Sequence, residues 1–324
     1  MIKILANDGI DAAGKKILDG AGFEIVTEKI PQDKLASSLK EFDAIFVRSA
    51  TKVTQEIIEA NSGLRLIGRA GVGLDNIDVE FAKHKGIKII NTPEASSQSV
   101  AELVFAHLFT MARMLHDSNR AMPSCDTKEK FEALKKKYSS GTELRGKTLG
   151  IIGFGKIGQA TARIALGLGM NVMPFKLHAQ DVKIEFDFFR TYGDAKMMIT
   201  MKCVPFEKLL SESDFITMHV PFPKGAVPVI TSKELMLMKD GVSIVNTARG
   251  GVIAEEDLLQ ALNTGKVAFA ALDVFKDEPL VKKELREHPN VSLSPHIGGS
   301  TKEAQERIGI ELASKVVQYF VGSN

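Results

Sequence analysis

Three polar residues in the second half of the sequence each come shortly after an apolar run: Arg249, Glu278 and His296. An arginine can bind a carboxylate through two parallel hydrogen bonds. A histidine can take up or return a hydroxyl proton, and an acid can hold its imidazole in one tautomer. Each residue alone is as readily explained as a structural or surface group. Together, behind a glycine-rich loop, they predict the catalytic residues of a hydride-transfer site.

The glycine-rich loop is Gly153-x-Gly155-x-x-Gly158, which follows a β-like run at 148–152. In a dinucleotide-binding turn the first glycine permits the tight turn, the second lets the backbone approach a pyrophosphate, and the third lets helix and strand pack closely. The helix expected at 159–167 then offers free N–H groups to the anion. The sequence predicts a dinucleotide at this loop, with Lys156 and Ile157 among the residues that bind it.

The next predicted strand, 171–175, departs from the usual dinucleotide pattern. An Asp or Glu about 20 residues after the glycines normally binds the ribose hydroxyls, but here Lys176 follows the strand and Asp181 is the next acid. A lysine can neutralise a 2′-phosphate, which would favour NADP, whereas Asp181 or a backbone carbonyl could take the place of the acid. Lys176 is expected beside the cofactor, and NAD is placed ahead of NADP only by the resemblance given below. The segment 181–202 is interpreted as an insertion without an assigned purpose.

The first hundred residues alternate predicted strands with helices, which indicates a parallel α/β sheet. The predicted strands are 2–6, 23–26, 44–47, 64–68 and 87–90. Ligands of such sheets lie beyond the carboxyl ends of the strands, where Arg48, Arg69 and Gly71 fall. Two arginines at neighbouring strand ends fit a substrate with a phosphate and a carboxylate, although surface ion pairs are the simpler alternative.

A long helix is expected over 96–120, capped by Ser96, Ser97 or Ser99, with Glu102 completing a capping box. Its middle is apolar nearly all round, so it should be buried between domains or against a second subunit. Strand–helix alternation resumes at 147 and runs to about 294. An amphipathic helix at 300–320 is expected to return to the first domain. The predicted domains are 1–98 plus 297–324 for the substrate and 99–296 for the dinucleotide.

The composition excludes several classes of protein. The 324 residues are 44% hydrophobic and 25% charged, with a formal net charge of +2, so a nucleic-acid partner is not expected. Two cysteines form no disulfide framework or metal-binding pattern, and no metal site is expected. No signal peptide is recognised and no apolar run approaches the ~20 residues that span a bilayer, which favours a cytoplasmic protein without a membrane partner.

The motifs, taken in order, resemble those of the D-isomer-specific 2-hydroxyacid dehydrogenase family over nearly the whole chain. The matching segments are 44–49, 68–78, 150–158, 246–250, 273–279 and 295–301. The resemblance implies two Rossmann-like α/β domains with parallel sheets, namely a flavodoxin-like substrate domain and an NAD(P)-binding Rossmann domain. It also implies that Arg249, Glu278 and His296 are the catalytic arginine, glutamate and histidine.

The same resemblance implies further site residues. Asp273 would hold the nicotinamide amide, and the backbone at 70–73 would bind the substrate carboxylate. Besides the glycine-rich loop and Lys176, the implied cofactor residues are His219, Val220, Pro221, Thr247, Ala248, Asp273, His296 and Gly298. The implied substrate residues are Arg48, Ser49, Arg69, Ala70, Gly71, Val72, Arg249 and His296.

Within the family, segments 47–53 and 68–71 are most similar to the branch that oxidises D-3-phosphoglycerate in serine biosynthesis. That implies a phosphorylated 2-hydroxy acid as substrate and a homodimer formed through the dinucleotide-binding domain and the 96–120 helix. On the long helix, Arg113 is predicted to reach the neighbouring subunit's site. Because the sequence ends at Asn324, no C-terminal regulatory domain is expected.

Two alternative functions remain open at this point. A hydroxypyruvate or glyoxylate reductase of the same family would need no phosphate site. A cofactor-sensing corepressor scaffold would keep the same three residues without catalysis, but such proteins place a tryptophan in the site and this chain has none. Formate dehydrogenase is disfavoured, because it carries Gln where Pro295 stands and lacks Glu278.

Overall fold

The computed structural model describes residues 1–178, 180–188, 195–223 and 225–322. The chain divides into two compact units: unit 1 comprises Met1–Ser99 and Gly299–Asn324, and unit 2 comprises Val100–Gly298. Ile297 and Gly298 thus lie in unit 2 rather than in the substrate domain to which the sequence assigned them. Their backbone N–H groups both donate to Asp273, which ties them to that unit.

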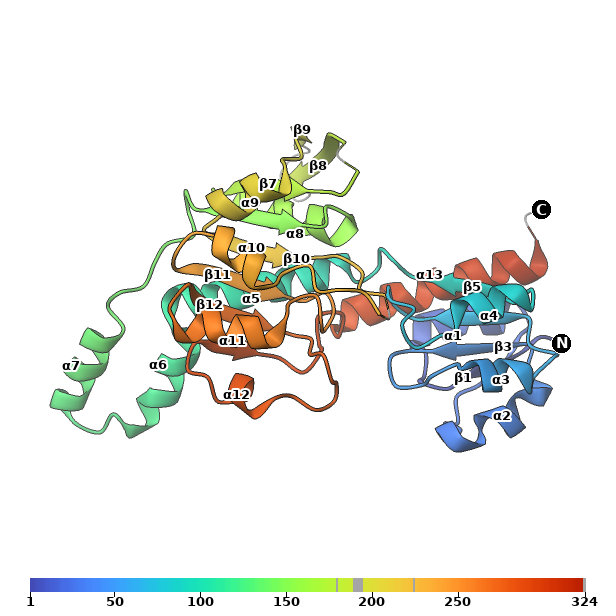
Figure 1. The fold of residues 1–324 in the computed structure, drawn as a ribbon. Coiled ribbons are helices and arrows are strands. Elements are labelled where there is room, and N and C mark those ends of the chain that lie inside the picture. The colour runs from blue at the N-terminus through green and yellow to red at the C-terminus, as the bar shows by residue number, and fades with distance from the viewer. Residues whose placement is uncertain (179, 189–194, 224, 323–324) are drawn as a thin grey trace. The chain divides into compact units, whose positions relative to one another are not determined.

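Unit 1 is built on a five-stranded parallel sheet in the order β2-β1-β3-β4-β5 (Figure 1). The strands are β1 (Lys3–Ala6), β2 (Glu24–Val26), β3 (Ala44–Val47), β4 (Leu66–Arg69) and β5 (Lys88–Asn91). This strand order is that of the flavodoxin-like folds, so the predicted class of the first domain is confirmed.

Successive residues of a strand point to opposite sides of the sheet, so a strand that is apolar throughout gives the sheet two apolar faces. Helices cover both faces of this sheet. Ile4 packs with α1 (Ala12–Gly20) and α13 (Lys302–Val321), whereas its neighbour Leu5 packs on the opposite face. The opposite face carries α2 (Leu35–Ser38), α3 (Gln55–Glu59) and α4 (Val79–His84), with the short 3-10 turns η1 (Gln32–Lys34) and η2 (Leu39–Glu41). The C-terminal helix therefore completes the core that the first hundred residues begin.

Close contact between α1 and α13 depends on two glycines. A Cβ on Gly14 would lie 2.5 Å from the carbonyl oxygen of Gly309. Both helices begin at a side-chain cap: Asp11 accepts from Ala13 N and Thr301 accepts from Ala304 N. The caps and the missing side chains let the two helices cross with their backbones touching.

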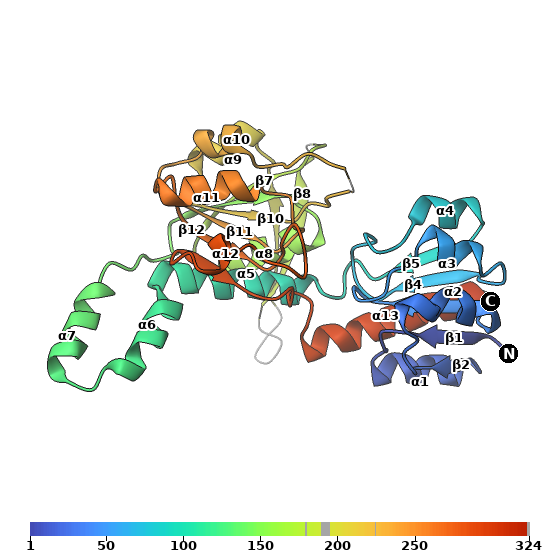
Figure 2. The same ribbon diagram turned by 60° about the horizontal axis from the view of Figure 1, so that its bottom comes forward.

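Unit 2 is built on a six-stranded parallel sheet in the order β13-β12-β11-β10-β6-β7, most of whose strands are labelled in Figure 2. The strands are β6 (Thr148–Ile152), β7 (Asn171–Phe175), β10 (Phe215–Met218), β11 (Val242–Asn246), β12 (Val267–Leu272) and β13 (Val291–Leu293). The predicted parallel, Rossmann-like second domain is confirmed. Strands β11, β12 and β13 are direct neighbours.

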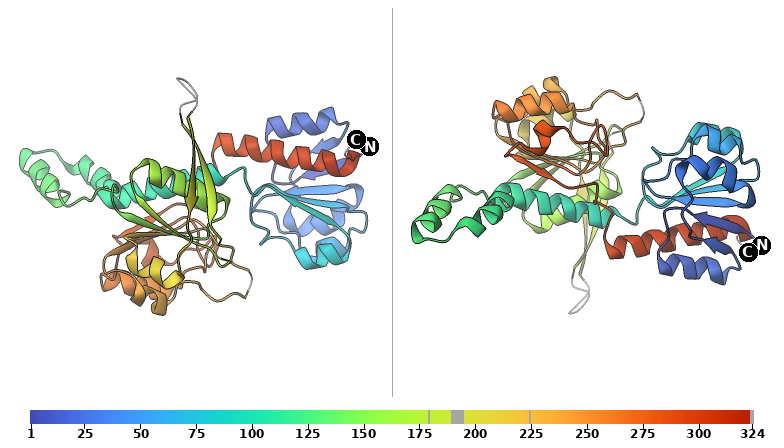
Figure 3. Two further views of the ribbon diagram at one scale, coloured as in Figure 1. Left: turned by 90° about the horizontal axis from the view of Figure 1, so that it is seen from above. Right: turned by 90° about the horizontal axis from the view of Figure 1, so that it is seen from below.

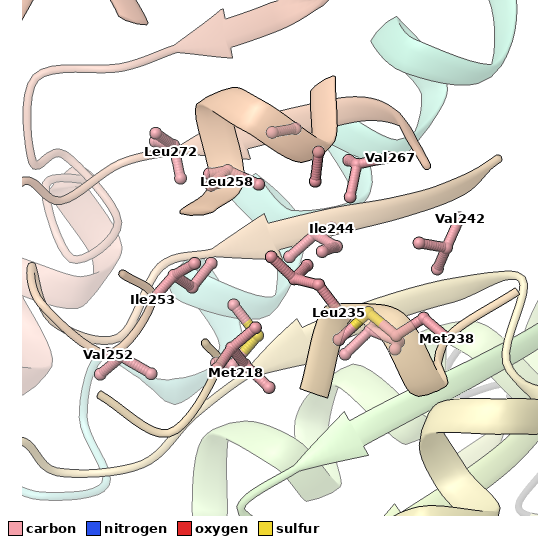
Figure 4. Packing of buried hydrophobic residues seen from close by; sticks show 14 of the residues in the cluster. Met218, Leu235, Met238, Val242, Ile244, Val252, Ile253, Leu258, Val267 and Leu272 are labelled. Carbon is pink, nitrogen blue, oxygen red and sulfur yellow. The ribbon is translucent and has the colours of Figure 1, made fainter. Parts of the chain in front are cut away.

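One face of this sheet packs against α9 (Phe206–Glu212), α10 (Ser232–Leu237) and α11 (Glu255–Asn263). Figure 4 shows part of this core, where Leu235 and Leu258 from the helices meet Ile244 and Met218 from the strands. The other face packs against α5 (Ser97–Arg113) and α8 (Lys156–Gly167). The short helix α12 (Lys283–Arg286) precedes β13.

The predicted insertion at 181–202 contains an antiparallel hairpin of β8 (Val182–Phe188) and β9 (Ala195–Met201), and its tip, 189–194, lies outside the described residues. The hairpin projects from unit 2 in both views of Figure 3. At its base Ile184, Phe186 and Met201 are buried in the same core as α8. The base of the insertion is therefore part of the core of unit 2.

The single helix predicted over 96–120 is wrong. The helix α5 ends at Arg113, Met114 adopts a left-handed conformation with φ 48°, and α6 (Leu115–Ala121) starts in a new direction. At this point Thr142 N donates to the carbonyl of Ala112. The helix α7 (Lys128–Lys137) follows the 3-10 turn η3 (Met122–Ser124). The predicted capping box is also wrong, because Ser99 lies inside α5 and its hydroxyl bonds to Thr301.

Among the described residues, no helix combines the length and the apolar character needed to cross a membrane. Within the same residues, no group of three or more His, Cys, Asp and Glu side chains is placed to hold a metal ion.

Candidate active site

The carboxyl ends of three neighbouring strands bring the predicted catalytic residues of unit 2 to one edge of its sheet. Arg249 follows β11, Glu278 follows β12 and His296 follows β13. Parallel strands end at the same edge, so adjacency in the sheet explains why residues 47 positions apart meet. Backbone bonds continue the sheet past the strands, since Asp273 N donates to Asn246 O and Ser294 N to Leu272 O.

Glu278 and His296 form a hydrogen-bonded pair. Nδ1 of His296 lies 2.8 Å from Oε2 of Glu278, while Oε1 of Glu278 accepts from Phe275 N at 2.9 Å. Because the carboxylate accepts at Nδ1, the neutral imidazole carries its proton there and leaves Nε2 as the proton acceptor. The side chains of Glu278 and His296 are 35% and 41% exposed, so the pair is accessible from solution.

Charge at this pair favours the ionised acid. Partial burial acts to raise the pKa of Glu278, but the hydrogen bonds from His296 and Phe275 N, with the charges of His296 and Arg249, outweigh it and hold that pKa below its ordinary value. The contribution from Arg249 also places this arginine in the electrostatic neighbourhood of Glu278.

The loop that carries Arg249 is held by Asn246, a residue to which the sequence analysis gave no role. Its Oδ1 accepts from Ala248 N at 3.0 Å and its Nδ2 donates to Arg249 O at 2.9 Å. Nη1 of Arg249 in turn donates to Ala248 O at 2.6 Å. An Asn at a strand end followed by a tight turn is a known signal for such a side-chain-to-backbone turn, so this function was readable from the sequence.

The loop that carries His296 is wound around the carboxylate of Asp273, which is 1% exposed. Its Oδ1 accepts from Ser294 Oγ at 2.6 Å and Ile297 N at 2.9 Å, and its Oδ2 accepts from Gly298 N at 2.9 Å. Between these anchors, His296 adopts φ 54°, a left-handed conformation that a non-glycine residue rarely takes. Asp273 is therefore a structural anchor of the histidine loop, whatever it contributes to cofactor binding.

The glycine-rich loop fits a dinucleotide by steric criteria. Gly153 has φ 94° and a Cβ there would lie 2.5 Å from His219 O; a Cβ on Gly158 would lie 2.5 Å from Gly153 O. Gly155, the N-cap of α8, has open space around its would-be Cβ. The first and third glycines are thus required by packing, and the second leaves the backbone accessible to a phosphate. Helix α8 begins at Lys156, so Lys156 and Ile157 lie in its first turn, three residues earlier than predicted.

The other predicted cofactor residues of unit 2 lie near the carboxyl ends of its strands. Lys176 and Leu177 are exposed directly after β7, and the first acid in the described segment that follows is Asp181. Thr247 lies just beyond β11, and its buried hydroxyl has no partner among the described residues. Val220 and Pro221 follow β10. The Thr247 hydroxyl is available to bond a polar ligand at this edge, and the open space at Gly155 leaves room for one.

His219 lies below the glycine-rich loop. Its Nε2 is 3.3 Å from Thr161 Oγ1 on α8 and 3.2 Å from Thr217 Oγ1 on β10. Burial of the ring lowers the pKa of His219 to about 3, so the ring is neutral at physiological pH. The backbone of His219 borders the loop and leaves no space for a side chain at position 153. Its ring contacts Thr161 on α8.

Apart from Arg249 and His296, the predicted substrate residues lie in unit 1 at the carboxyl ends of β3 and β4. Asp8 Oδ2 accepts from Arg48 N at 2.7 Å, which fixes the turn containing Arg48 and Ser49. Arg69 folds back over the next loop: its Nη1 donates to Ala70 O at 2.6 Å and lies where a Cβ on Gly71 would be. The loop continues to Val72, whose carbonyl accepts from Asn91 at 2.8 Å.

Comparison with known proteins agrees with this architecture. The family model described as D-isomer specific 2-hydroxyacid dehydrogenase, NAD binding domain, matches residues 105–298. Hydroxypyruvate reductase of Thermotoga maritima is 43% identical over 97% of this chain and 97% of its own length. D-3-phosphoglycerate dehydrogenase of Synechocystis is 38% identical over 99% of this chain but 55% of its own length, so the chain spans about half of that relative.

A solved structure of D-mandelate dehydrogenase from Rhodotorula graminis, in its holo form, matches with a TM-score of 0.84 at 27% identity, covering 98% of this chain and 94% of that one. The fold and the site thus define a dehydrogenase that uses a nicotinamide dinucleotide. The chain belongs to the D-isomer-specific 2-hydroxyacid dehydrogenase family, as the resemblance of its motifs predicted.

Proposed function

We propose that the protein interconverts a D-2-hydroxy acid and its 2-keto acid, with D-3-phosphoglycerate as the substrate in the oxidative direction. The Glu278–His296 pair, whose histidine side chain is partly exposed, is the observation that carries the reaction type. The phosphorylated substrate is supported by Arg48, directly after β3, and by Arg69, the last residue of the neighbouring strand β4. The similarity to D-3-phosphoglycerate dehydrogenase also supports it.

In the proposed mechanism, Arg249 binds the substrate carboxylate through its guanidinium. Nε2 of His296 takes the hydroxyl proton as the carbon is oxidised, and Glu278 stabilises the imidazolium that forms. A nicotinamide dinucleotide held at the glycine-rich loop would supply the hydride acceptor. In reduction the same histidine returns the proton to the developing alkoxide, so His296→Ala should abolish turnover in both directions and leave dinucleotide binding intact.

A hydroxypyruvate reductase is the second candidate, and a specific observation favours it. The T. maritima relative is 43% identical and matches along the whole of its length, and Arg69 is engaged with its own loop. Such an enzyme would use the same three catalytic residues on an unphosphorylated keto acid.

Steady-state rates with 3-phosphohydroxypyruvate and hydroxypyruvate separate the two candidates. For the first we expect a higher kcat/KM with the phosphorylated acid, and Arg48→Ala should remove that preference by raising KM for it alone. Equal effects of Arg48→Ala on both substrates, or a wild-type preference for hydroxypyruvate, would establish the second candidate. No turnover of either acid, together with intact binding of NADH, would favour the corepressor-like scaffold.

NAD is proposed as the cofactor, and Lys176 as the residue that sets how well NADP is tolerated. Dissociation constants for NADH and NADPH, measured by cofactor fluorescence, test this. Lys176→Asp restores an acid after β7, so it should weaken NADPH binding and strengthen NADH binding. Unchanged constants for both would show that residue 176 does not contact the ribose.

A homodimer is proposed through α5 and the helices that follow it. Four large apolar side chains in this part of the chain are exposed: Phe109 at 43%, Leu115 at 56%, Met122 at 48% and Phe131 at 48%. Light scattering of the wild type and of Phe109→Lys measures the association. A monomeric wild type at micromolar concentration would contradict the proposal, and with it a role for Arg113 in a neighbouring site.

A further inference from the structure

A buried histidine on α5 is connected to the anchor of the catalytic loop. His107 is 6% exposed, with Nδ1 2.9 Å from Ser292 Oγ and Nε2 3.0 Å from Ser294 Oγ. Ser294 Oγ in turn lies 2.6 Å from Oδ1 of Asp273. All these residues belong to unit 2. The sequence analysis assigned no function to His107, Ser292 or Ser294.

The donor and acceptor of each hydrogen bond in this series can be assigned by starting from Asp273. Oδ1 of Asp273 also accepts from Ile297 N, and an ionised carboxylate only accepts, so the Ser294 hydroxyl must donate to it. A hydroxyl has one proton, so Ser294 Oγ must accept from Nε2–H of His107. The neutral ring then has a bare Nδ1, to which the Ser292 hydroxyl donates.

Burial lowers the pKa of His107, against the opposing charge of Asp273, which keeps the ring in this neutral form. The three hydrogen bonds therefore point the same way: Ser292 donates to His107, His107 donates to Ser294, and Ser294 donates to Asp273. The partners of the two ring nitrogens are the hydroxyls of Ser292, inside β13, and Ser294, directly after it. They lie four and two residues before His296.

We propose that His107 is a positioning residue for His296. It fixes the Ser294 hydroxyl toward Asp273, and Asp273 holds the backbone on the far side of His296 through Ile297 N and Gly298 N. This arrangement over-determines the left-handed backbone at His296, where φ is 54°, and so keeps Nδ1 at Glu278. The effect on turnover rests on the proposed function, whereas the effect on the loop does not.

The wild-type protein provides the first test, which requires no activity. In ¹H–¹⁵N NMR spectra of the imidazoles, assigned by comparison with His107→Gln, residue 107 should show the Nε2–H tautomer in its neutral form. An Nδ1–H tautomer would overturn the assigned direction of these hydrogen bonds.

The second test uses two variants at one position. His107→Phe keeps a ring but removes both hydrogen bonds, whereas the amide of His107→Gln can donate from near the position of Nε2. In His107→Phe, the missing hydrogen bond to Ser294 should increase hydrogen exchange of the Ile297 and Gly298 amides. It should also lower kcat about tenfold, which corresponds to the free energy of one hydrogen bond. KM for the hydroxy acid should change less than about twofold, and Gln should restore most of kcat. Equal kcat in Phe and Gln would overturn the proposal.

A stability control and a double-mutant cycle exclude a purely structural effect. Leu108→Ala removes a fully buried neighbour of His107 and should destabilise the protein without raising exchange at 297–298 selectively. Ser294→Ala should lower kcat as His107→Phe does, and the double variant should be no worse than either. Additive losses would overturn the proposal. If the wild type turns over no 2-hydroxy acid but His107→Phe still raises exchange at 297–298, only the proposed function is refuted.

Discussion

Gly153 and Gly155 belong to the same loop but differ in the space around them. The fold requires a glycine at Gly153, whereas only a bound ligand would require one at Gly155. At Gly153 a side chain would collide with the backbone of His219, and φ is 94°. At Gly155 a side chain would meet nothing in the protein, so only a bound pyrophosphate would exclude it.

The glycine-rich loop therefore provides a matched pair of variants. Gly153→Ala should lower the free energy of unfolding by about 1–3 kcal/mol, because of strain and overlap. Gly155→Ala should leave that free energy nearly unchanged and weaken NADH binding by roughly tenfold or more. Urea unfolding and NADH fluorescence measure the two effects; the chain has no tryptophan to interfere. Normal NADH affinity in Gly155→Ala would argue against pyrophosphate binding at this loop.

The buried His219 predicts how stability depends on pH. The folded-state pKa is about 3 and the ordinary value is 6.5, so below pH 6.5 the unfolded chain binds a proton that the folded chain does not. Stability is therefore retained above pH 6.5 and lost as pH falls, by on the order of 1 kcal/mol per pH unit. His219→Gln should reduce the loss between pH 7.5 and 5.5, whereas the exposed His116→Gln should not. Parallel stability curves for wild type and His219→Gln would contradict this.

At the scale of elements, the alternation of apolar strands and helices was enough to predict both parallel sheets and the shared edge for Arg249 and His296. The sequence could not predict contacts that depend on packing between distant segments, such as His107 with Ser292. The hairpin at 182–201 was readable, because Val182, Ile184 and Phe186 alternate with polar residues as strands do. It was not predicted, because the segment was interpreted only as an insertion without an assigned purpose.

The break between α5 and α6 was not readable, because nothing in a methionine favours the left-handed conformation that Met114 adopts. That conformation costs a non-glycine residue about 1–2 kcal/mol. Met114→Gly should therefore leave the melting temperature unchanged or raise it, and Met114→Val should lower it. Arg113→Val, at the last residue of α5, is the control for β-branching alone. A lower melting temperature in Met114→Gly would show that the Met114 side chain, and not the backbone, decides stability here.

At the scale of the whole molecule, each unit has its own core. The apolar clusters of unit 1 combine α1, α13 and the first sheet, and those of unit 2 contain none of these elements. A defect in one core should therefore leave the ligand affinity of the other unit intact.

Gly14→Ala tests this separation. The new Cβ would overlap the backbone of α13 at Gly309, which should cost about 1–3 kcal/mol and raise hydrogen exchange in α1 and α13. Binding of NADH by unit 2 should change less than twofold. Gly20→Ala is the matched control, since a Cβ there meets nothing within 4 Å. A parallel loss of NADH affinity in Gly14→Ala would show that the two cores are energetically coupled.

The return of α13 to unit 1 also orders events on the ribosome. The strands of unit 1 are synthesised first, but Ile308, Leu312 and Val316, which bury one face of its sheet, emerge only after all of unit 2. At ~5–20 residues per second, the nascent sheet waits on the order of ten seconds or more with that face uncovered. Unit 2 can therefore fold first, while an apolar face of the first sheet stays exposed until α13 is synthesised.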